Sequence, residues 1–116
     1  MKKLYFLVGP MGCGKNYVGE RFSEELGYPF IDGDAFVPET MAEKVAKFKP
    51  LGQKDIDDFI NNHLIPGVET AYDDSLGLVV AQALYRKEHR DQLRRHFGDA
   101  CQIVLVKANL FTNLAR

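Results

Sequence analysis

The chain has 116 residues, of which 46% are hydrophobic and 27% charged, with a formal net charge of −1 at pH 7. This length and composition predict a single globular domain over residues 1–116. The near-neutral charge argues against a nucleic-acid partner, and no segment reaches the ~20 apolar residues of a membrane-spanning helix. Two cysteines, Cys13 and Cys101, suggest neither a metal cluster nor a disulfide framework, so we expect a cytoplasmic protein with reduced thiols.

The first third of the chain reads as strand, loop, helix and strand. Leu4–Val8 is a continuous apolar run, which is typical of a strand buried on both faces. Apolar residues spaced four apart predict a helix over 15–26, and Gly27 is placed to end it. A second short strand is expected over 29–31. This order predicts a parallel βαβ unit.

The remaining elements continue the alternation. Apolar stripes predict helices, and apolar runs predict two further strands, the first of them central in the sheet. The expected elements are helices over 41–48 and 56–64, the second kinked or interrupted at Pro66-Gly67, a strand over 76–84, a helix over 86–97, a strand over 103–106 and a helix that starts at Leu110. The pattern predicts an α/β fold with a doubly wound parallel sheet that binds ligands at the carboxyl ends of its strands.

The stretch "VGPMGCGKN" after the first strand resembles a phosphate-binding loop, G-x-x-x-x-G-K-[ST]. In such a loop successive backbone N–H groups cradle phosphates, and the following helix adds its positive end. The lysine reaches the β and γ phosphates, and the hydroxyl after it ligates Mg²⁺. The residues expected to hold the nucleotide are Gly9, Pro10, Met11, Gly12, Cys13, Gly14, Lys15 and Asn16.

Asn16 occupies the position where the motif has serine or threonine. Its amide oxygen can ligate a hard cation, but asparagine is longer than serine and Mg²⁺ demands near-octahedral geometry. We therefore expect weakened Mg²⁺ binding with nucleotide binding retained.

Asp32-Gly33-Asp34 directly follows the second strand. Two carboxylates spaced in this way can divide their roles, one holding a metal-bound water and the other meeting a substrate hydroxyl. The alternative is a solvated turn with an aspartate cap. Because both the loop and this pair end parallel strands, we expect them to converge at one edge of the sheet.

Several segments together resemble the gluconate kinases, in the shikimate-kinase-like group of P-loop small-molecule kinases. The similarity includes the loop, the D-G-D turn and "KVAKFKPLGQKDIDDF", and continues in "VVAQALYRKEHRDQLRR" with one apparent insertion. The matching positions beyond the loop are Asp32, Gly33, Asp34, Pro38, Lys44, Pro50, Leu51, Asp55, Ala83, Leu84, Arg90, Asp91, Leu93 and Arg94. The resemblance runs along essentially the whole chain.

The resemblance implies a three-layer α/β/α P-loop fold and an ATP-dependent, Mg²⁺-using kinase that phosphorylates a hydroxyl of a sugar acid or related polyol acid. Lys15 would stabilise the transferred phosphoryl group and Asp34 would orient the acceptor hydroxyl and take its proton, so these two are the candidate catalytic residues. Asp32, with Asn16, would hold the metal. The implied partner is a small molecule, and a homodimer is compatible with it.

Three positions depart from the family pattern: Val37 stands in place of histidine, Phe48 in place of glycine and Ile56 in place of arginine. The missing arginine removes a bidentate partner for a substrate carboxylate, which puts gluconate itself in doubt. The candidate substrate-binding residues are therefore Asp34, Lys44, Arg86 and Arg90. For the two arginines the competing interpretation is a solvated basic helix face.

The family pattern continues after the position of Arg116 with a lid, a final strand and an adenine-contacting loop. The sequence is thus expected to be truncated before the lid and last strand, either as a fragment or as a short natural form. Without lid arginines we expect slow turnover. Two alternatives stay open: a nucleotide-binding P-loop module with little or no turnover, and, ranked lower, a nucleoside monophosphate kinase-like enzyme.

Overall fold

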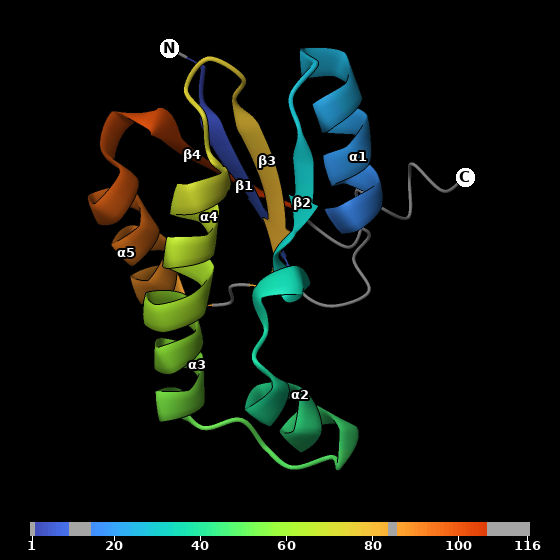
Figure 1. The fold of residues 1–116 in the computed structure, drawn as a ribbon, viewed down its shortest axis with the longest axis vertical. Helices are drawn as coiled ribbons and strands as arrows, with labels where there is room; N and C mark the ends of the chain where they lie inside the picture. The colour runs from blue at the N-terminus through green and yellow to red at the C-terminus, as the bar shows by residue number, and fades with distance from the viewer. Residues whose placement is uncertain (1, 10–14, 84–85, 107–116) are drawn as a thin grey trace. The chain divides into compact units, whose positions relative to one another are not determined.

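The computed structural model describes residues 2–9, 15–83 and 86–106 (Figure 1). Contacts between Cα atoms divide the chain into two compact units. The first unit comprises residues 1–32 and 72–116, and the second comprises residues 33–71. Most of the predicted loop, residues 10–14, and the helix expected from Leu110 lie outside the described residues. None of the helices in the described part combines the length and hydropathy that crossing a membrane requires.

The first unit is built on a parallel sheet of four strands in the order β2-β3-β1-β4. The strands are β1 (Leu4–Val8), β2 (Phe30–Asp32), β3 (Leu78–Gln82) and β4 (Cys101–Leu105), and the helices are α1 (Lys15–Leu26) and α5 (Lys87–Phe97). The prediction of a central third strand is confirmed, because β3 lies between β2 and β1. Its start is two residues later than predicted, since a tight turn precedes it and Gly77 has φ +74°.

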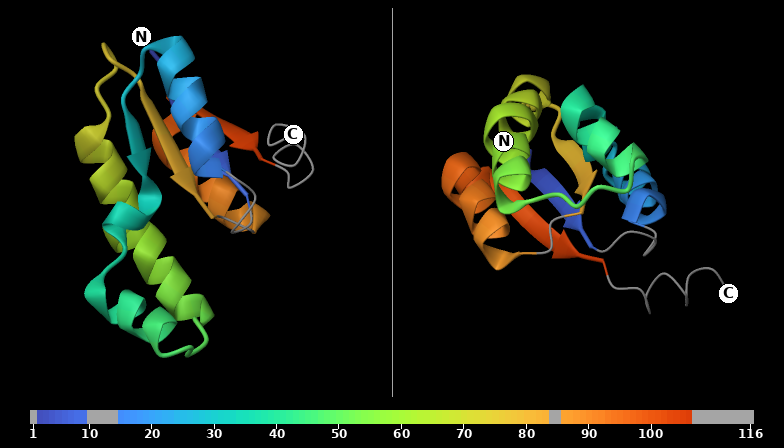
Figure 2. Two further views of the ribbon diagram at one scale, coloured as in Figure 1. Left: turned by 90° about the vertical axis from the view of Figure 1, so that its right-hand side faces the viewer. Right: turned by 90° about the horizontal axis from the view of Figure 1, so that it is seen from below.

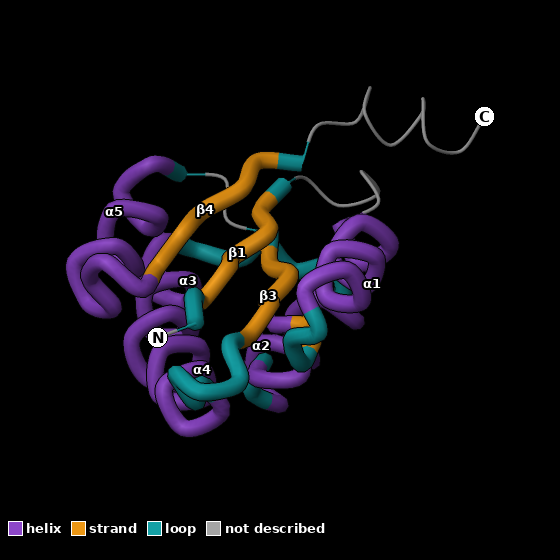
Figure 3. Tube along the Cα trace, turned by 90° about the horizontal axis from the view of Figure 1, so that it is seen from above, coloured by secondary structure: helices purple, strands orange, loops and turns teal. Residues whose placement is uncertain are grey.

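Helices α1 and α5 lie on opposite faces of this sheet, as Figure 3 shows. Side chains alternate along a strand, so neighbouring residues of β1 point to different helices. Leu7 packs with Val79 and with the apolar residues of α1, whereas the ring of Phe6 lies 6.0 Å from that of Phe97 in α5. Leu4, Phe6, Leu7 and Val8 are all fully buried. This double burial explains the continuous apolar run in the sequence, and it gives the first unit three layers.

The amino edge of the sheet is closed by contacts between neighbouring loops. Lys2 N–H donates to the Asp74 carbonyl at 2.7 Å, and the Tyr72 hydroxyl donates to the Lys2 carbonyl. The ammonium group of Lys3 donates to the Asp99 carbonyl at 2.8 Å. The ring of Tyr28 lies directly against Gly77. These contacts hold the start of the strands.

The second unit contains a 3₁₀ turn over Gly33–Phe36, then α2 (Glu39–Ala46), and then a helical rod made of α3 (Gln53–Phe59), a π-helical segment over Ile60–Leu64 and α4 (Ile65–Ala71) (Figure 2). Pro66 lacks an N–H group, and its ring would clash with the carbonyl four residues earlier in a regular α-helix. That carbonyl, of Asn62, belongs to the π segment, and a wider π turn is one way in which a helix accommodates a local disturbance. The sequence predicted a kink or an interruption at Pro66-Gly67, with the helix continuing beyond it; the structure has the π segment directly before Ile65 and a continuation through Ala71.

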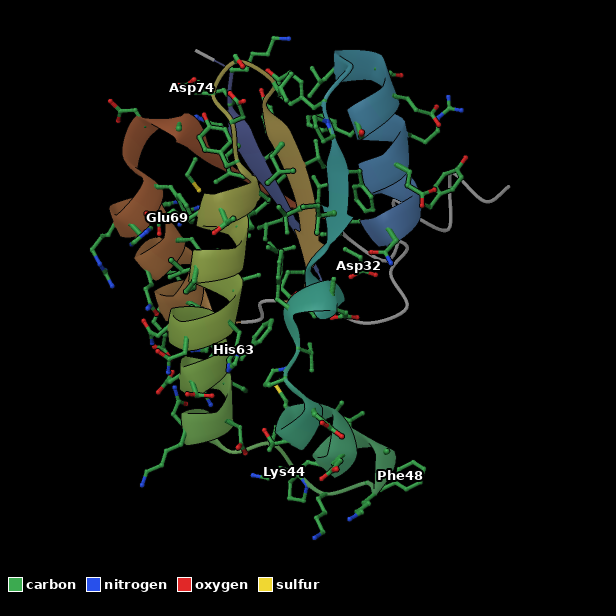
Figure 4. The ribbon with its side chains drawn as sticks, in the orientation of Figure 1. Asp32, Lys44, Phe48, His63, Glu69 and Asp74 are labelled. Carbon is green, nitrogen blue, oxygen red and sulfur yellow. The ribbon has the colours of Figure 1, made fainter. Side chains whose placement is uncertain are left out.

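Phe48, two residues after the end of α2, has an uncommon backbone conformation, with φ +56°. Phe48 N–H donates to the Val45 carbonyl at 3.1 Å, and Lys49 N–H donates to the Lys44 carbonyl at 2.8 Å. This pair of bonds is a Schellman motif, in which the left-handed position favours glycine. The side chain of Phe48 is 95% exposed and projects away from α2 (Figure 4).

Replacement of Phe48 with glycine should raise the free energy of unfolding by about 0.5–1 kcal/mol, because glycine adopts this conformation without a steric penalty. The exposed ring contributes little packing that could be lost. Phe48→Ala is the control, since it removes the ring and keeps the backbone cost. Urea denaturation of the three proteins tests this: equal stabilities for Phe48→Gly and Phe48→Ala would contradict the backbone argument.

Candidate functional site

The predicted metal and nucleotide residues of the first unit meet where α1 begins and β2 ends. Asn16 lies in the first turn of α1. Asp32, which Figure 4 labels, is the last residue of β2. The Nδ2 amide of Asn16 donates a hydrogen bond to Oδ2 of Asp32 at 2.8 Å. Two residues that are 16 positions apart in sequence are thus brought together at the carboxyl edge of the sheet.

The start of α1 is suited to an anion. Its first turn carries no acidic residue, so nothing in the helix itself neutralises the positive end of the helix dipole. Gly9, directly after β1, leads toward this helix, and Lys15 is its first residue. The loop residues Pro10, Met11, Gly12, Cys13 and Gly14, and the side chain of Lys15, lie outside the described part, so their assignment to phosphate binding stays a prediction.

The Asn16–Asp32 pair offers the oxygen donors that Mg²⁺ prefers. The hydrogen bond uses the amide nitrogen of Asn16 and therefore leaves its amide oxygen oriented away from this bond. Within the described residues no three His, Cys, Asp or Glu side chains gather in a way that could hold a metal. A Mg²⁺ ion here would accordingly take few protein ligands, which is usual for Mg²⁺ bound with substrate phosphates and water. The residues present fit such an ion.

The second carboxylate of the D-G-D turn, Asp34, lies in the second unit. Its side chain is exposed, and its carbonyl accepts a hydrogen bond from Val37 N–H at 3.1 Å. The turn is held by Phe36, whose ring lies so close to α4 that a Cβ on Gly67 would come within 2.4 Å of it. Gly67 therefore provides the space into which the turn packs, and this contact was not expected from the sequence.

Lys44 does not project unpaired from α2, because Asp55 of α3 holds its ammonium group. The Lys44 Nζ lies 2.8 Å and 3.0 Å from the two carboxylate oxygens of Asp55. Asp55 also accepts a hydrogen bond from Gly52 N–H at 2.9 Å, which caps the start of α3. The hydrogen bonds from Lys44 and Gly52 lower the pKa of Asp55. A substrate carboxylate bound by Lys44 would have to share the cation with Asp55.

This pair should make the stability of the second unit sensitive to acid. Because the pKa of Asp55 is lower in the folded state, its stabilising effect is complete above the unfolded pKa and is lost as the pH falls through the folded value. We expect wild type to lose more stability than Lys44→Met between about pH 5 and pH 2. Chemical denaturation across that range measures the difference, and parallel pH profiles would show that the pair is not coupled to folding.

The two candidate arginines lie at the start of α5. Arg86 occupies the N-cap position, is exposed and pairs with Glu88 at 3.4 Å. Arg90 is half-buried one turn further along, and its N–H donates to the Arg86 carbonyl at 3.4 Å. Their place after β3 puts them next to the carboxyl edge of the sheet in the chain, but their role in substrate binding stays a prediction.

Sequence reasoning missed Gln82, the last residue of β3. It is 6% exposed, and its Oε1 has no hydrogen-bond donor in the described part of the chain. The one sequence signal was a polar residue at the end of the apolar run "LVVAQ". Cys101, by contrast, is buried with a free thiol, and desolvation raises its pKa to about 11, so it is an inert core residue.

Comparison with known protein families and curated proteins extends this description. The model of the shikimate kinase family matches residues 11–66. A curated protein of Schizosaccharomyces pombe, "Probable gluconokinase", is 29% identical over 94 residues, which cover 80% of this chain and 49% of that protein. The chain therefore spans about half the length of this relative.

Solved structures show the same fold. A gluconokinase from Sinorhizobium meliloti 1021 superposes with a TM-score of 0.76 at 29% identity, and the match covers 89% of this chain and 56% of that one. A sugar kinase from Janibacter sp. HTCC2649 superposes with a TM-score of 0.78 at 18% identity, covering 97% of this chain and 65% of that one. At this lower identity the second match supports the fold alone.

The parallel sheet with α1 directly after β1, shared with these structures, defines the class as an α/β P-loop kinase fold. Within that class the chain is similar to gluconokinases and, over residues 11–66, to the shikimate kinase family. The fold expected from the sequence is thereby confirmed, and the comparisons support the resemblance to the shikimate-kinase-like group. Kinases of this kind act on small molecules, use ATP and typically require Mg²⁺.

Proposed function

We propose that this chain binds ATP with Mg²⁺ and transfers the terminal phosphoryl group to a hydroxyl of a sugar acid or related polyol acid. The observation that carries the proposal is the hydrogen bond from Asn16 to Asp32 at the carboxyl edge of a P-loop-type sheet. This bond joins Asn16, the residue after the motif lysine, to the carboxylate of Asp32 at the end of β2. The likeness to gluconokinases and to the shikimate kinase family model supports the acceptor class.

In this proposal the loop from Gly9 to Asn16 holds the phosphates through the backbone N–H groups of its residues other than Pro10, and Lys15 stabilises the negative charge on the transferred group. Asn16 and Asp32 would hold Mg²⁺, which when bound would neutralise negative charge on the phosphates. Asp34 would accept the proton of the acceptor hydroxyl. The acceptor oxygen then forms a bond to the γ phosphorus, the bond from that phosphorus to the bridging oxygen breaks, and ADP leaves.

The carboxylate of the acceptor needs a cation, since the family arginine is replaced by Ile56. The candidates that we propose for it are Lys44 in the second unit, and Arg86 and Arg90 in the first. Lys44 pairs with Asp55 and Arg86 pairs with Glu88, so either cation would have to be shared with a substrate carboxylate. We extend the proposal to a cytoplasmic location, where ATP and reduced thiols are found.

A second candidate function is a nucleotide-binding module with little or no turnover. It is favoured by Asn16, because an amide that donates to Asp32 is a poorer Mg²⁺ ligand than the hydroxyl of the usual motif. The two functions differ in their response to metal and acceptor.

Calorimetric titration of ATP with and without Mg²⁺, together with an ADP-release assay in the presence of gluconate, shikimate or nucleoside monophosphates, tests these functions. A kinase should bind Mg²⁺-ATP more tightly than ATP alone and release ADP faster when a sugar acid is added. Metal-independent binding without acceptor-stimulated ADP release would favour the module. The absence of any heat at millimolar ATP or ADP would reject both.

A further inference from the structure

Gln82 has an unexplained buried amide. Its side chain is 6% exposed, and Oε1 meets no hydrogen-bond donor among the described residues. Buried polar atoms in folded proteins almost always have a partner, because leaving one unpaired loses the hydrogen bonds it would make to water. An orphaned atom of this kind at a functional edge is expected when its partner is a ligand.

The position of Gln82 in the sheet is known from the strand register. It ends the central strand β3 and lies beside Val8, the last residue of β1 before the proposed phosphate loop. Its neighbour Ala81 lies beside Asp32 of β2. Gln82 is therefore at the same carboxyl edge as the proposed metal residues, within the first unit.

Because side chains alternate along a strand, Gln82 lies on the opposite face of the sheet from Asn16 and Asp32. Val79 packs on the α1 face, so Val80 and Gln82 face the opposite way, as does Phe6, which pairs in register with Val80 and contacts α5. The phosphate and metal residues thus belong to the α1 face. The face with Gln82 is also the one on which α5 lies, the helix that begins after Arg86 and carries Arg90.

The chemistry of the orphaned atom limits its partner. An amide oxygen accepts hydrogen bonds and cannot donate them, so it binds an O–H or N–H group and repels a carboxylate or phosphate oxygen. A polyol acid presents both kinds of group, a carboxylate that suits the α5 arginines and hydroxyls that suit Gln82. We propose that Gln82 Oε1 accepts a hydrogen bond from a hydroxyl of the acceptor substrate, a proposal that rests on the proposed kinase function.

The competing explanation is a buried structural water that satisfies Oε1 in the free protein. The two explanations differ in their consequences for stability. If the partner is the acceptor, the free protein keeps an unpaired polar atom, and Gln82→Leu should raise its unfolding temperature by several degrees. If the partner is a structural water, the leucine displaces it, and the unfolding temperature should fall or stay unchanged.

Acceptor binding provides the second measurement. Gluconate and shikimate are titrated by calorimetry into the protein held with Mg²⁺-ADP, a non-reactive nucleotide. Gln82→Leu should weaken acceptor binding by roughly tenfold to a hundredfold and leave the affinity for ADP unchanged. Gln102→Leu is the matched control, because it makes the same substitution at an exposed position of the edge strand β4 and should affect neither quantity.

A series of gluconates that each lack one hydroxyl locates the partner. One member of the series should have a lower affinity than gluconate for wild type. The same member and gluconate should have equal affinities for Gln82→Leu. Equal acceptor affinities for wild type and Gln82→Leu, or an unfolding temperature of this variant that is unchanged or lower, would overturn the role of Gln82 while the kinase function stands. If wild type binds ADP but no acceptor of either class, the acceptor assignment and the role of Gln82 both fall.

Discussion

Replacement of Gly77 with alanine should lower the free energy of unfolding by about 2–4 kcal/mol, because the methyl group adds a backbone cost and a steric overlap. Gly77 has φ +74°, a left-handed conformation that costs alanine roughly 1–2 kcal/mol. In addition, its new Cβ would lie 2.6 Å from two atoms of the Tyr28 ring. Steric overlap with a packed ring adds the remainder.

Tyr28 has little room to move away. Its ring centroid lies 6.0 Å from that of Tyr5 in the core, the Lys2 ammonium lies 5.7 Å from its centroid, and its carbonyl accepts a hydrogen bond from Ser23. The substitution should also weaken the pairing of β2 with β3. Tyr28 precedes β2 and Gly77 precedes β3, and these strands are joined by the bond from Val79 N–H to the Pro29 carbonyl at 2.9 Å.

Gly27→Ala separates the two costs. Gly27 has φ +70° at the end of α1, but an added Cβ would meet nothing within 4 Å. We expect this control to lose about 1 kcal/mol, the backbone cost alone. Urea denaturation of both variants gives the comparison. Equal losses in the free energy of unfolding would show that the Tyr28 ring moves aside without an energetic cost.

The second large effect is expected at Asp32. Asp32→Asn keeps the size of the side chain and removes the negative charge that would face Mg²⁺, so the preference for Mg²⁺-ATP over ATP should fall by at least about tenfold. Binding of metal-free ATP should be retained or improved, since a negative charge near the phosphates is removed. Calorimetry with each form of the nucleotide measures both changes.

Asp74→Asn is the matched control, because this carboxylate lies at the amino edge of the sheet, far from Asp32 (Figure 4). It should leave the metal preference unchanged. Asn16→Ser acts in the opposite direction to Asp32→Asn. A hydroxyl restores the usual motif ligand and should strengthen Mg²⁺ binding and turnover. If Asn16→Ser changes neither, the asparagine does not weaken the metal site.

The fold could be predicted because its determinants are local. Buried parallel strands produce continuous apolar runs such as Leu4–Val8, and helices produce stripes that end at glycines such as Gly27. The order of strands and helices then restricts the topology. Strand ends were less certain: β3 starts at Leu78 because a turn and the left-handed Gly77 come first, which the apolar run from Leu76 concealed.

The candidate site was predictable only in part. A motif indicates which residue types a phosphate needs, so Asn16 and Asp32 could be named in advance. Their hydrogen bond depends on how the turn of α1 meets the end of β2. The ion pair of Lys44 with Asp55, the packing of Phe36 on Gly67 and the orphaned oxygen of Gln82 are tertiary contacts, and one sequence without its packing carries no information on them.

The two ends of the sheet in the first unit differ in how completely their polar groups are matched. At the start of the strands, the loops around Lys2, Tyr72 and Gly77 interlock through backbone bonds and a ring contact. At the carboxyl ends of the strands, the buried amide oxygen of Gln82 has no hydrogen-bond donor in the described part of the chain. Random substitutions should therefore have effects that depend on their position in the sheet. Substitutions at the amino ends of the strands should lower the yield of folded protein. Substitutions at the carboxyl ends should change ligand preference in protein that still folds normally.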